Sequence, residues 1–178
     1  MSTKRSGRVA LGGVFTALAV AILLFTYFPT ASIALAAVAA LCGIPVVVEL
    51  GQRAGLLHYA AVAVLAALVA LTAEGTGLYI AFFGWYTTFK AFLEGKGLSR
   101  PLEWAVKIGV FAVSIATYAA VWIFLLHMPL PKEFALWMIP VATVVLCGIF
   151  VMYDVGMTRV IGVYHFKIRP KLQKTFRF

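Results

Sequence analysis

The sequence predicts an all-α membrane protein, a single domain over residues 1–178 with six transmembrane helices and both termini on the cytoplasmic side. The chain is 63% hydrophobic and 12% charged, whereas soluble domains have roughly 45–50% apolar and about 25% charged residues. Its apolar runs divide into six segments near the length that a helix needs to cross a bilayer. Of the 15 Lys and Arg residues, all but Lys132 then lie on one side. Basic residues are retained on the cytoplasmic side, so they set the orientation.

The first three spans are expected over 8–28, 31–50 and 56–73. The connection between the first two is very short, which makes these helices antiparallel neighbours. Pro45 cannot donate a hydrogen bond to the carbonyl of Leu41, so we expect a kink in the second span. The third span should end in an outer turn over 74–77, which contains two glycines.

The last three spans are expected over 78–93, over 104–126, and from about 134 to about 154. The fourth is rich in aromatic residues and barely long enough to cross. The polar stretch 94–103 is expected to form the main cytoplasmic loop. Residues 155–178 are expected to form a basic tail that is cytoplasmic or lies at the membrane interface.

The net charge of +9 indicates membrane lipids as partners and no nucleic acid, because the basic residues flank the spans and would face the anionic leaflet. Cys42 and Cys147 lie within apolar spans and are expected to be buried thiols. The three histidines fall on separate elements, which predicts no metal site. No enzyme signature occurs, so we expect neither catalysis nor a cofactor.

Small residues recur every four positions on the first span, at Gly13, Ala17 and Ala21. This spacing places them on one helix face and allows another helix to approach closely. The face could pack within the chain's own bundle or could dock on another membrane protein.

Charged residues gather near the predicted cytoplasmic ends of the spans, at Lys90, Glu94, Lys107, Asp154 and Arg159. Charges within the hydrocarbon are costly and are expected to be paired. Lys90 and Glu94 have i,i+4 spacing, and Asp154 could pair with Lys107 between neighbouring spans. A structural charge ring is the simpler reading, since an ion relay needs acids deeper in the membrane.

Aromatic and polar residues also gather around the predicted outer loops, at Glu74, Thr76, Tyr79, Trp122, His127 and Trp137. Such a group could bind a small, partly aromatic ligand. Aromatic residues at this depth are equally typical of an interfacial anchoring belt.

Six short spans, cytoplasmic termini and the small-residue face of the first span together resemble the substrate-binding S component of an energy-coupling factor transporter. The segment 82–94 is also similar to a stretch of small bacterial membrane proteins of this shape. The resemblance implies that Gly13, Ala17 and Ala21 dock on a transmembrane coupling subunit, which carries two ATPases. A vitamin-like small molecule would be captured from outside a bacterial plasma membrane.

Two other functions remain open. A structural or assembly protein could bind lipids or a partner through its basic cytoplasmic face, particularly Arg169, Lys171 and Lys174. A stand-alone proton-coupled carrier is weakened by the lack of an internal repeat.

Overall fold

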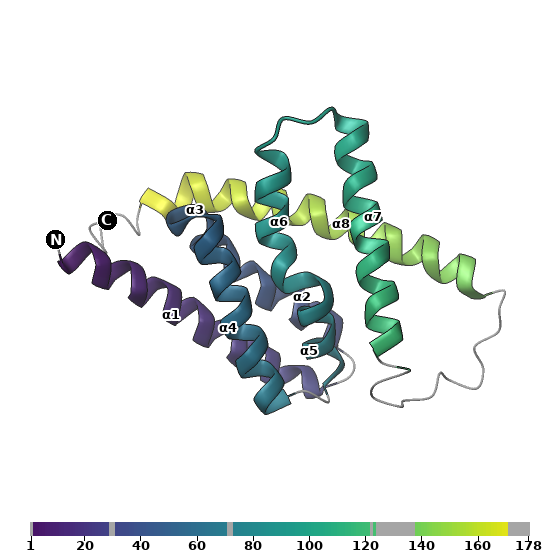
Figure 1. The fold of residues 1–178 in the computed structure, drawn as a ribbon, viewed down its shortest axis with the longest axis horizontal. Helices are drawn as coiled ribbons and strands as arrows, with labels where there is room; N and C mark the ends of the chain where they lie inside the picture. The colour runs from purple at the N-terminus through teal and green to yellow at the C-terminus, as the bar shows by residue number, and fades with distance from the viewer. Residues whose placement is uncertain (1, 29–30, 71–72, 122, 124–137, 171–178) are drawn as a thin grey trace.

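The computed structural model describes residues 2–28, 31–70, 73–121, 123 and 138–170, and every element in these ranges is helical (Figure 1). The α-helices are α1 (Ser2–Leu24), α2 (Ser32–Leu41), α3 (Gly43–Leu50), α4 (Gln52–Ala70), α5 (Glu74–Leu78), α6 (Gly84–Glu94), α7 (Arg100–Ala120) and α8 (Met138–Val163). A 3-10 turn, Phe25–Tyr27, follows α1, and π turns cover Tyr79–Phe83 and Tyr164–Ile168.

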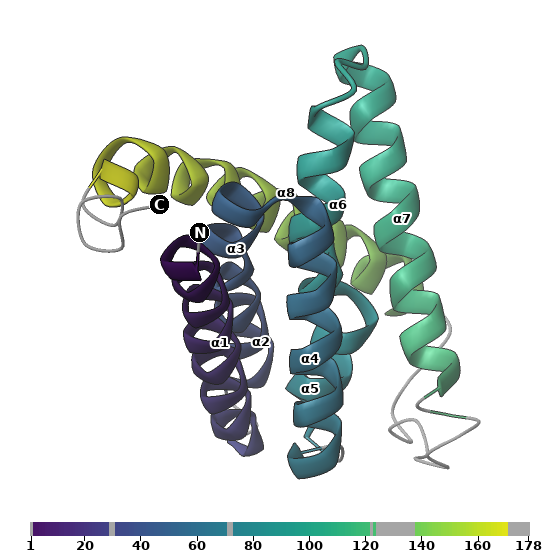
Figure 2. The ribbon, with the colours of Figure 1, turned by 60° about the vertical axis from the view of Figure 1, so that its left-hand side comes forward.

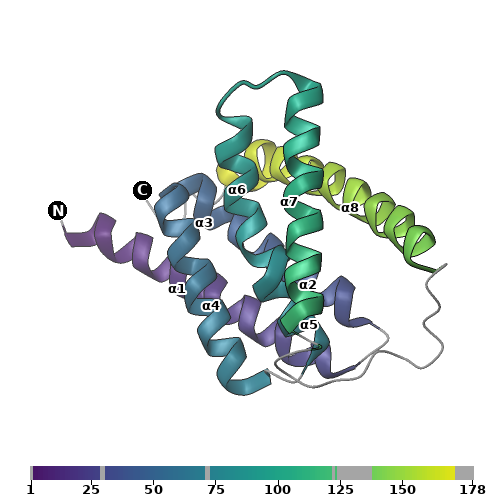
Figure 3. The ribbon, with the colours of Figure 1, turned by 45° about the vertical axis from the view of Figure 1, so that its right-hand side comes forward.

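Helices α1 to α7 form an antiparallel bundle, which Figure 2 shows with its helices nearly upright. The start of α1, the turn between α3 and α4 and the loop between α6 and α7 lie toward one end of the bundle. The start of α5 lies toward the other end. Helix α8 differs, because it crosses α6 and α7 at a steep angle in all three views (Figures 1 to 3).

The predicted kink in the second span is confirmed. The helix breaks at Cys42, between α2 and α3, and Pro45 lies in the first turn of α3. The missing N–H of Pro45 leaves the carbonyl of Leu41 without its usual helical donor, which favours a break at this point.

The predicted outer turn over 74–77 is wrong, because α5 already begins at Glu74. Its two glycines serve close packing instead of a turn. A Cβ atom on Gly75 would lie 2.6 Å from side-chain atoms of Thr26, and one on Gly77 would lie 2.8 Å from the ring of Tyr118. Gly75 and Gly77 therefore allow neighbouring parts of the chain to approach α5 closely, which a side chain at either position would prevent.

Helix α5, the π turn and α6 form one continuous helical segment in the centre of the bundle, in contact with α2, α3, α4 and α7. The hydroxyl of Tyr59 donates to the carbonyl of Ile80 within the π turn, at 2.8 Å. Backbone groups that an irregular helical turn leaves without their usual partner need one from a neighbouring helix when water cannot reach them.

Five segments of the described chain are long and apolar enough to cross a membrane, namely Ser6–Tyr27, Ser32–Leu50, Gln52–Ala70, Arg100–Ala120 and Thr143–Ile168. These overlap five of the six predicted spans, and the last of them extends to Ile168, well into the predicted tail. The central segment is not among them, because Lys90 and its many glycine, threonine, tyrosine and tryptophan residues reduce its apolar character. Its neighbours cover it, so lipid contact does not demand an apolar surface there.

The central segment also approaches α4 closely at Gly84, where a Cβ atom would lie 2.6 Å from the rings of both Tyr59 and Tyr79. We expect Gly84→Ala to destabilise the protein by about 1–3 kcal/mol, because the packed rings must move. The measurement is the thermal midpoint in detergent. Gly109→Ala on α7 is the matched control, since its Cβ would meet nothing within 4 Å, and it should be neutral or slightly stabilising. Equal midpoints for the two variants would contradict close packing at Gly84.

Candidate functional site

A buried ionic cluster lies where α8 crosses α6 and α7. Lys90 of α6 is 0% exposed, Lys107 of α7 is 2% exposed and Asp154 of α8 is 3% exposed. Asp154 stands in the middle of α8 and its neighbouring π turn, which form one continuous helix. The crossing of three helices therefore removes two ammonium groups and a carboxylate from both lipid and bulk water.

The carboxylate of Asp154 is held on both oxygens. Its Oδ1 accepts hydrogen bonds from Lys90 Nζ at 2.6 Å and from the hydroxyl of Tyr86 at 2.7 Å. Its Oδ2 accepts from Lys107 Nζ at 3.3 Å. One side chain of α8 thus binds two residues of α6 and one of α7.

Glu94 closes the cluster into a ring. Its Oε1 lies 2.7 Å from Lys90 Nζ and 3.0 Å from Lys107 Nζ, so Glu94 and Asp154 each bridge the same two lysines. Glu103 adds a third carboxylate, 2.6 Å from Lys107 Nζ. Each ammonium group consequently has at least two carboxylate partners.

This degree of pairing is what burial requires. Removing an ion from water costs several kcal/mol even after relaxation, and only close pairing with further hydrogen bonds offsets this. The cluster holds two cations and three carboxylates, so its excess charge is negative. Because the carboxylates and ammonium groups satisfy one another, the arrangement is suited to holding helices together and to binding a charged group at its open edge.

Aromatic rings pack against the cluster and fix the position of α8. Phe150 stacks on Phe111 of α7, with ring centroids 4.7 Å apart and planes at 14°. Phe150 also contacts Phe82 edge-on, and Tyr153 contacts Phe83 at 5.0 Å. This aromatic layer sets the depth at which Asp154 meets the lysines.

The cluster opens on its other side into a cleft of about 390 Å³ between α6, α7 and α8. The lining includes both charge signs and one indole ring: Glu94, Arg100, Glu103, Trp104, Lys107, Asp154 and Arg159. Lys107 Nζ lies 5.4 Å from the ring centroid of Trp104. The cleft therefore exposes one edge of the ionic cluster, and this edge carries both positive and negative side chains.

Two predicted ion pairs are confirmed, Lys90 with Glu94 and Lys107 with Asp154. Arg159 lines the cleft instead of joining the ring. Sequence reasoning missed Tyr86 and Glu103. Their spacing could have found them, because Tyr86 lies four residues before Lys90, and Glu103 lies four residues before Lys107.

The predicted docking residues Gly13, Ala17 and Ala21 are all exposed on α1. A Cβ atom on Gly13 would meet nothing within 4 Å. The structure thus leaves this face unused by the chain's own described helices.

Of the predicted outer-site residues that the structure describes, Glu74 is exposed, whereas Thr76 and Tyr79 are fully buried. The hydroxyls of Thr76 and Tyr79 have no hydrogen-bond partner among the described residues. Trp122, His127 and Trp137 lie outside the described residues, as do Lys171 and Lys174.

No protein-family model, curated protein or solved structure matches this chain.

We expect Asp154→Asn to destabilise the protein by about 1.5–3 kcal/mol, because Lys90 and Lys107 lose their hydrogen bonds to a shared carboxylate. Glu94 still pairs with both lysines, and Glu103 with Lys107. The measurement is the free energy of unfolding in mixed detergent. Glu74→Gln removes an exposed carboxylate and should change stability by at most about 0.5 kcal/mol. Lys90→Met should cost less in the Asp154→Asn background than in the wild type. Additive costs for these two substitutions would contradict a shared cluster.

Proposed function

We propose that the chain is a multi-pass membrane protein with six spans and both termini in the cytoplasm. The five long apolar helices support this proposal. The central segment Glu74–Glu94 adds a sixth crossing, because it extends about 30 Å at 1.5 Å per residue, the thickness of the hydrocarbon. Helix α8 exceeds that thickness and would cross with a strong tilt.

The distribution of basic residues supports the orientation. Arg8, Arg53, Lys96 and Arg100 lie on the segments that Figure 2 places toward one end of the bundle, whereas Glu74 begins the segment at the other end. Basic residues near span ends favour the cytoplasmic side.

Single-cysteine labelling tests this topology. In a background with Cys42 and Cys147 replaced by serine, Glu74→Cys should react with a membrane-impermeant maleimide in intact cells. Lys96→Cys should react only after the membrane is permeabilised. Both positions are exposed, so each serves as a control for the reactivity of the other. Labelling of both from outside would contradict the six-span arrangement.

We propose further that the protein is the substrate-capture subunit of an uptake system driven by a separate ATPase module. The observation that carries this proposal is the exposure of Gly13, Ala17 and Ala21 along α1. Packing within the chain's own bundle was the alternative use of this face, and the described helices do not cover it. Small residues at this spacing permit a close helix–helix contact.

The substrate would bind beneath the outer end of the central segment. Thr76 brings to this region a buried hydroxyl that has no hydrogen-bond partner among the described residues, and buried polar groups are normally hydrogen-bonded. A vitamin-like molecule with polar and aromatic parts could satisfy this hydroxyl. Glu74 would stand at the entrance, at the start of the same helix.

A structural role is the second candidate, favoured by the charges on α8. Arg159 and Lys167 are exposed, and Arg169 Nε lies 3.0 Å from Glu49 Oε1. Such a basic surface could engage anionic lipid or an acidic partner. In that case no helix of another protein would dock on α1.

Substitution on α1 distinguishes the two functions. We expect Ala17→Trp to abolish co-purification of a transmembrane coupling subunit and its ATPases from native membranes, because the indole would keep the partner helix away. The measurement is mass spectrometry of everything that co-elutes. Ala116→Trp is the control, since Ala116 is an exposed alanine on α7. A wild-type protein that elutes with lipid alone would favour the structural role.

A further inference from the structure

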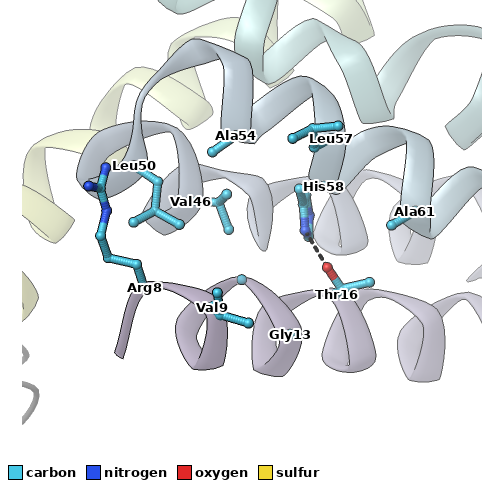
Figure 4. Close-up of a pocket in the computed structure, with 11 residues that line it drawn as sticks. Arg8, Val9, Gly13, Thr16, Val46, Leu50, Ala54, Leu57, His58 and Ala61 are labelled. Atoms are coloured by element: carbon cyan, nitrogen blue, oxygen red, sulfur yellow. Dashed lines mark hydrogen bonds between the residues drawn. The ribbon is translucent and has the colours of Figure 1, made fainter. Parts of the chain in front are cut away.

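A groove of about 480 Å³ runs between α1, α3 and α4 (Figure 4), and none of the residues that line it belongs to the ionic cluster. This volume lies within the range of roughly 300–1,000 Å³ that is usual for small-ligand sites. Most of the lining is aliphatic: Val9, Val46, Leu50, Ala54, Leu57 and Ala61. The three helices all belong to segments that can span a membrane, so the groove would face acyl chains and not water.

The floor of the groove is bare backbone at Gly12 and Gly13. A Cβ atom added at either position would meet nothing within 4 Å. These glycines therefore leave room on α1 that no described side chain fills. An elongated apolar chain could lie along this floor.

The two ends of the groove differ in polarity. Arg8 lies at one end and is exposed, and none of the residues that line the groove is acidic. Within the described residues, Arg8 has no carboxylate partner. Deeper along the groove, Thr16 Oγ1 and His58 Nδ1 are hydrogen-bonded at 2.9 Å (Figure 4). The imidazole of His58 is thus bonded at Nδ1, while its buried Nε2 has no partner among the described residues. At the shallow end, the charge of Arg8 is unpaired within the described part of the chain.

We propose that this groove binds an anionic phospholipid of the leaflet next to Arg8. One acyl chain lies over Gly12 and Gly13, and the phosphate pairs with the Arg8 guanidinium. Basic pockets between transmembrane helices are suited to anionic headgroups. An amphiphilic anion fits a groove that combines aliphatic walls with the cation Arg8. An apolar protein helix fits it less well, because such a helix would bring no negative charge to Arg8.

The test is native mass spectrometry of the delipidated full chain with added phosphatidylglycerol or phosphatidylcholine of the same acyl chains. The wild type should bind phosphatidylglycerol more tightly. Gly12→Leu should weaken binding of both lipids about tenfold, the effect of displacing two methylenes at ~0.8 kcal/mol each. Arg8→Gln should reduce the preference for phosphatidylglycerol about fivefold, as expected for one basic residue worth ~1 kcal/mol at an anionic leaflet.

Matched controls lie outside the groove. Gly109→Leu enters open space on α7, and Arg53→Gln removes an exposed charge from the start of α4. Both should bind lipid as the wild type does. Ala61→Phe blocks the groove from α4 and replaces Gly12→Leu if that variant does not fold, with Ala60→Phe as its control.

Unchanged lipid binding in both groove-blocking variants would overturn the proposal. An unchanged headgroup preference in Arg8→Gln would overturn the assignment of the phosphate. The proposal requires no coupling subunit, and the groove shares Gly13 but neither Ala17 nor Ala21 with the docking face. Lipid binding and co-purification of a partner are therefore tested by different variants.

Discussion

The arrangement of the last three helices depends on one carboxylate, Asp154, buried between two lysines. A buried lysine in a membrane protein is tolerated only when an opposite charge or water satisfies it. Lys90 has no exposure, so its pairing with Asp154 and Glu94 is a condition for α6 to lie in the centre of the bundle. The same carboxylate determines where α8 crosses α6 and α7. Sliding α8 by one turn would move Asp154 by about 5 Å and leave both lysines with less charge compensation.

The central segment can be polar because other helices surround it. It carries Thr87, Thr88 and Lys90 in buried positions, a pattern that would be unfavourable against lipid. Helices α1, α4 and α7 supply the apolar exterior, with exposed Val14, Leu68 and Val113 among many. The apolar character of a segment therefore does not identify the helix that lies deepest in this bundle. Burial, and not composition, is what makes this segment compatible with a membrane.

Much of the fold could be predicted from local sequence, whereas the site could be predicted only in part. The places of the five long apolar helices follow from the apolar runs, and the break near Pro45 follows from the missing proline N–H. Helix ends were less predictable, because α8 continues past Asp154 and α5 begins at Glu74. The pairing of Lys107 with Asp154 follows from their position on neighbouring spans. The shorter contact between Lys90 and Asp154 could not be predicted, because it depends on the crossing angle of α8. That angle is set by the packing of aromatic rings far apart in sequence, such as Phe111 and Phe150.

Few side chains of helix α1 are buried against the rest of the bundle, so much of its surface is left for contacts outside the chain. Within its described part it buries mainly Leu11, Ala19 and Leu23, while Gly12 and Gly13 contribute no side chain to packing. Glycine in a helix interior costs about 0.5–1 kcal/mol relative to alanine. Two adjacent glycines on this helix thus lower its stability without improving its contacts with α3 or α4. Such a cost is offset when something outside the chain fills the space that the glycines leave, either an acyl chain in the groove or a partner helix on the exposed face.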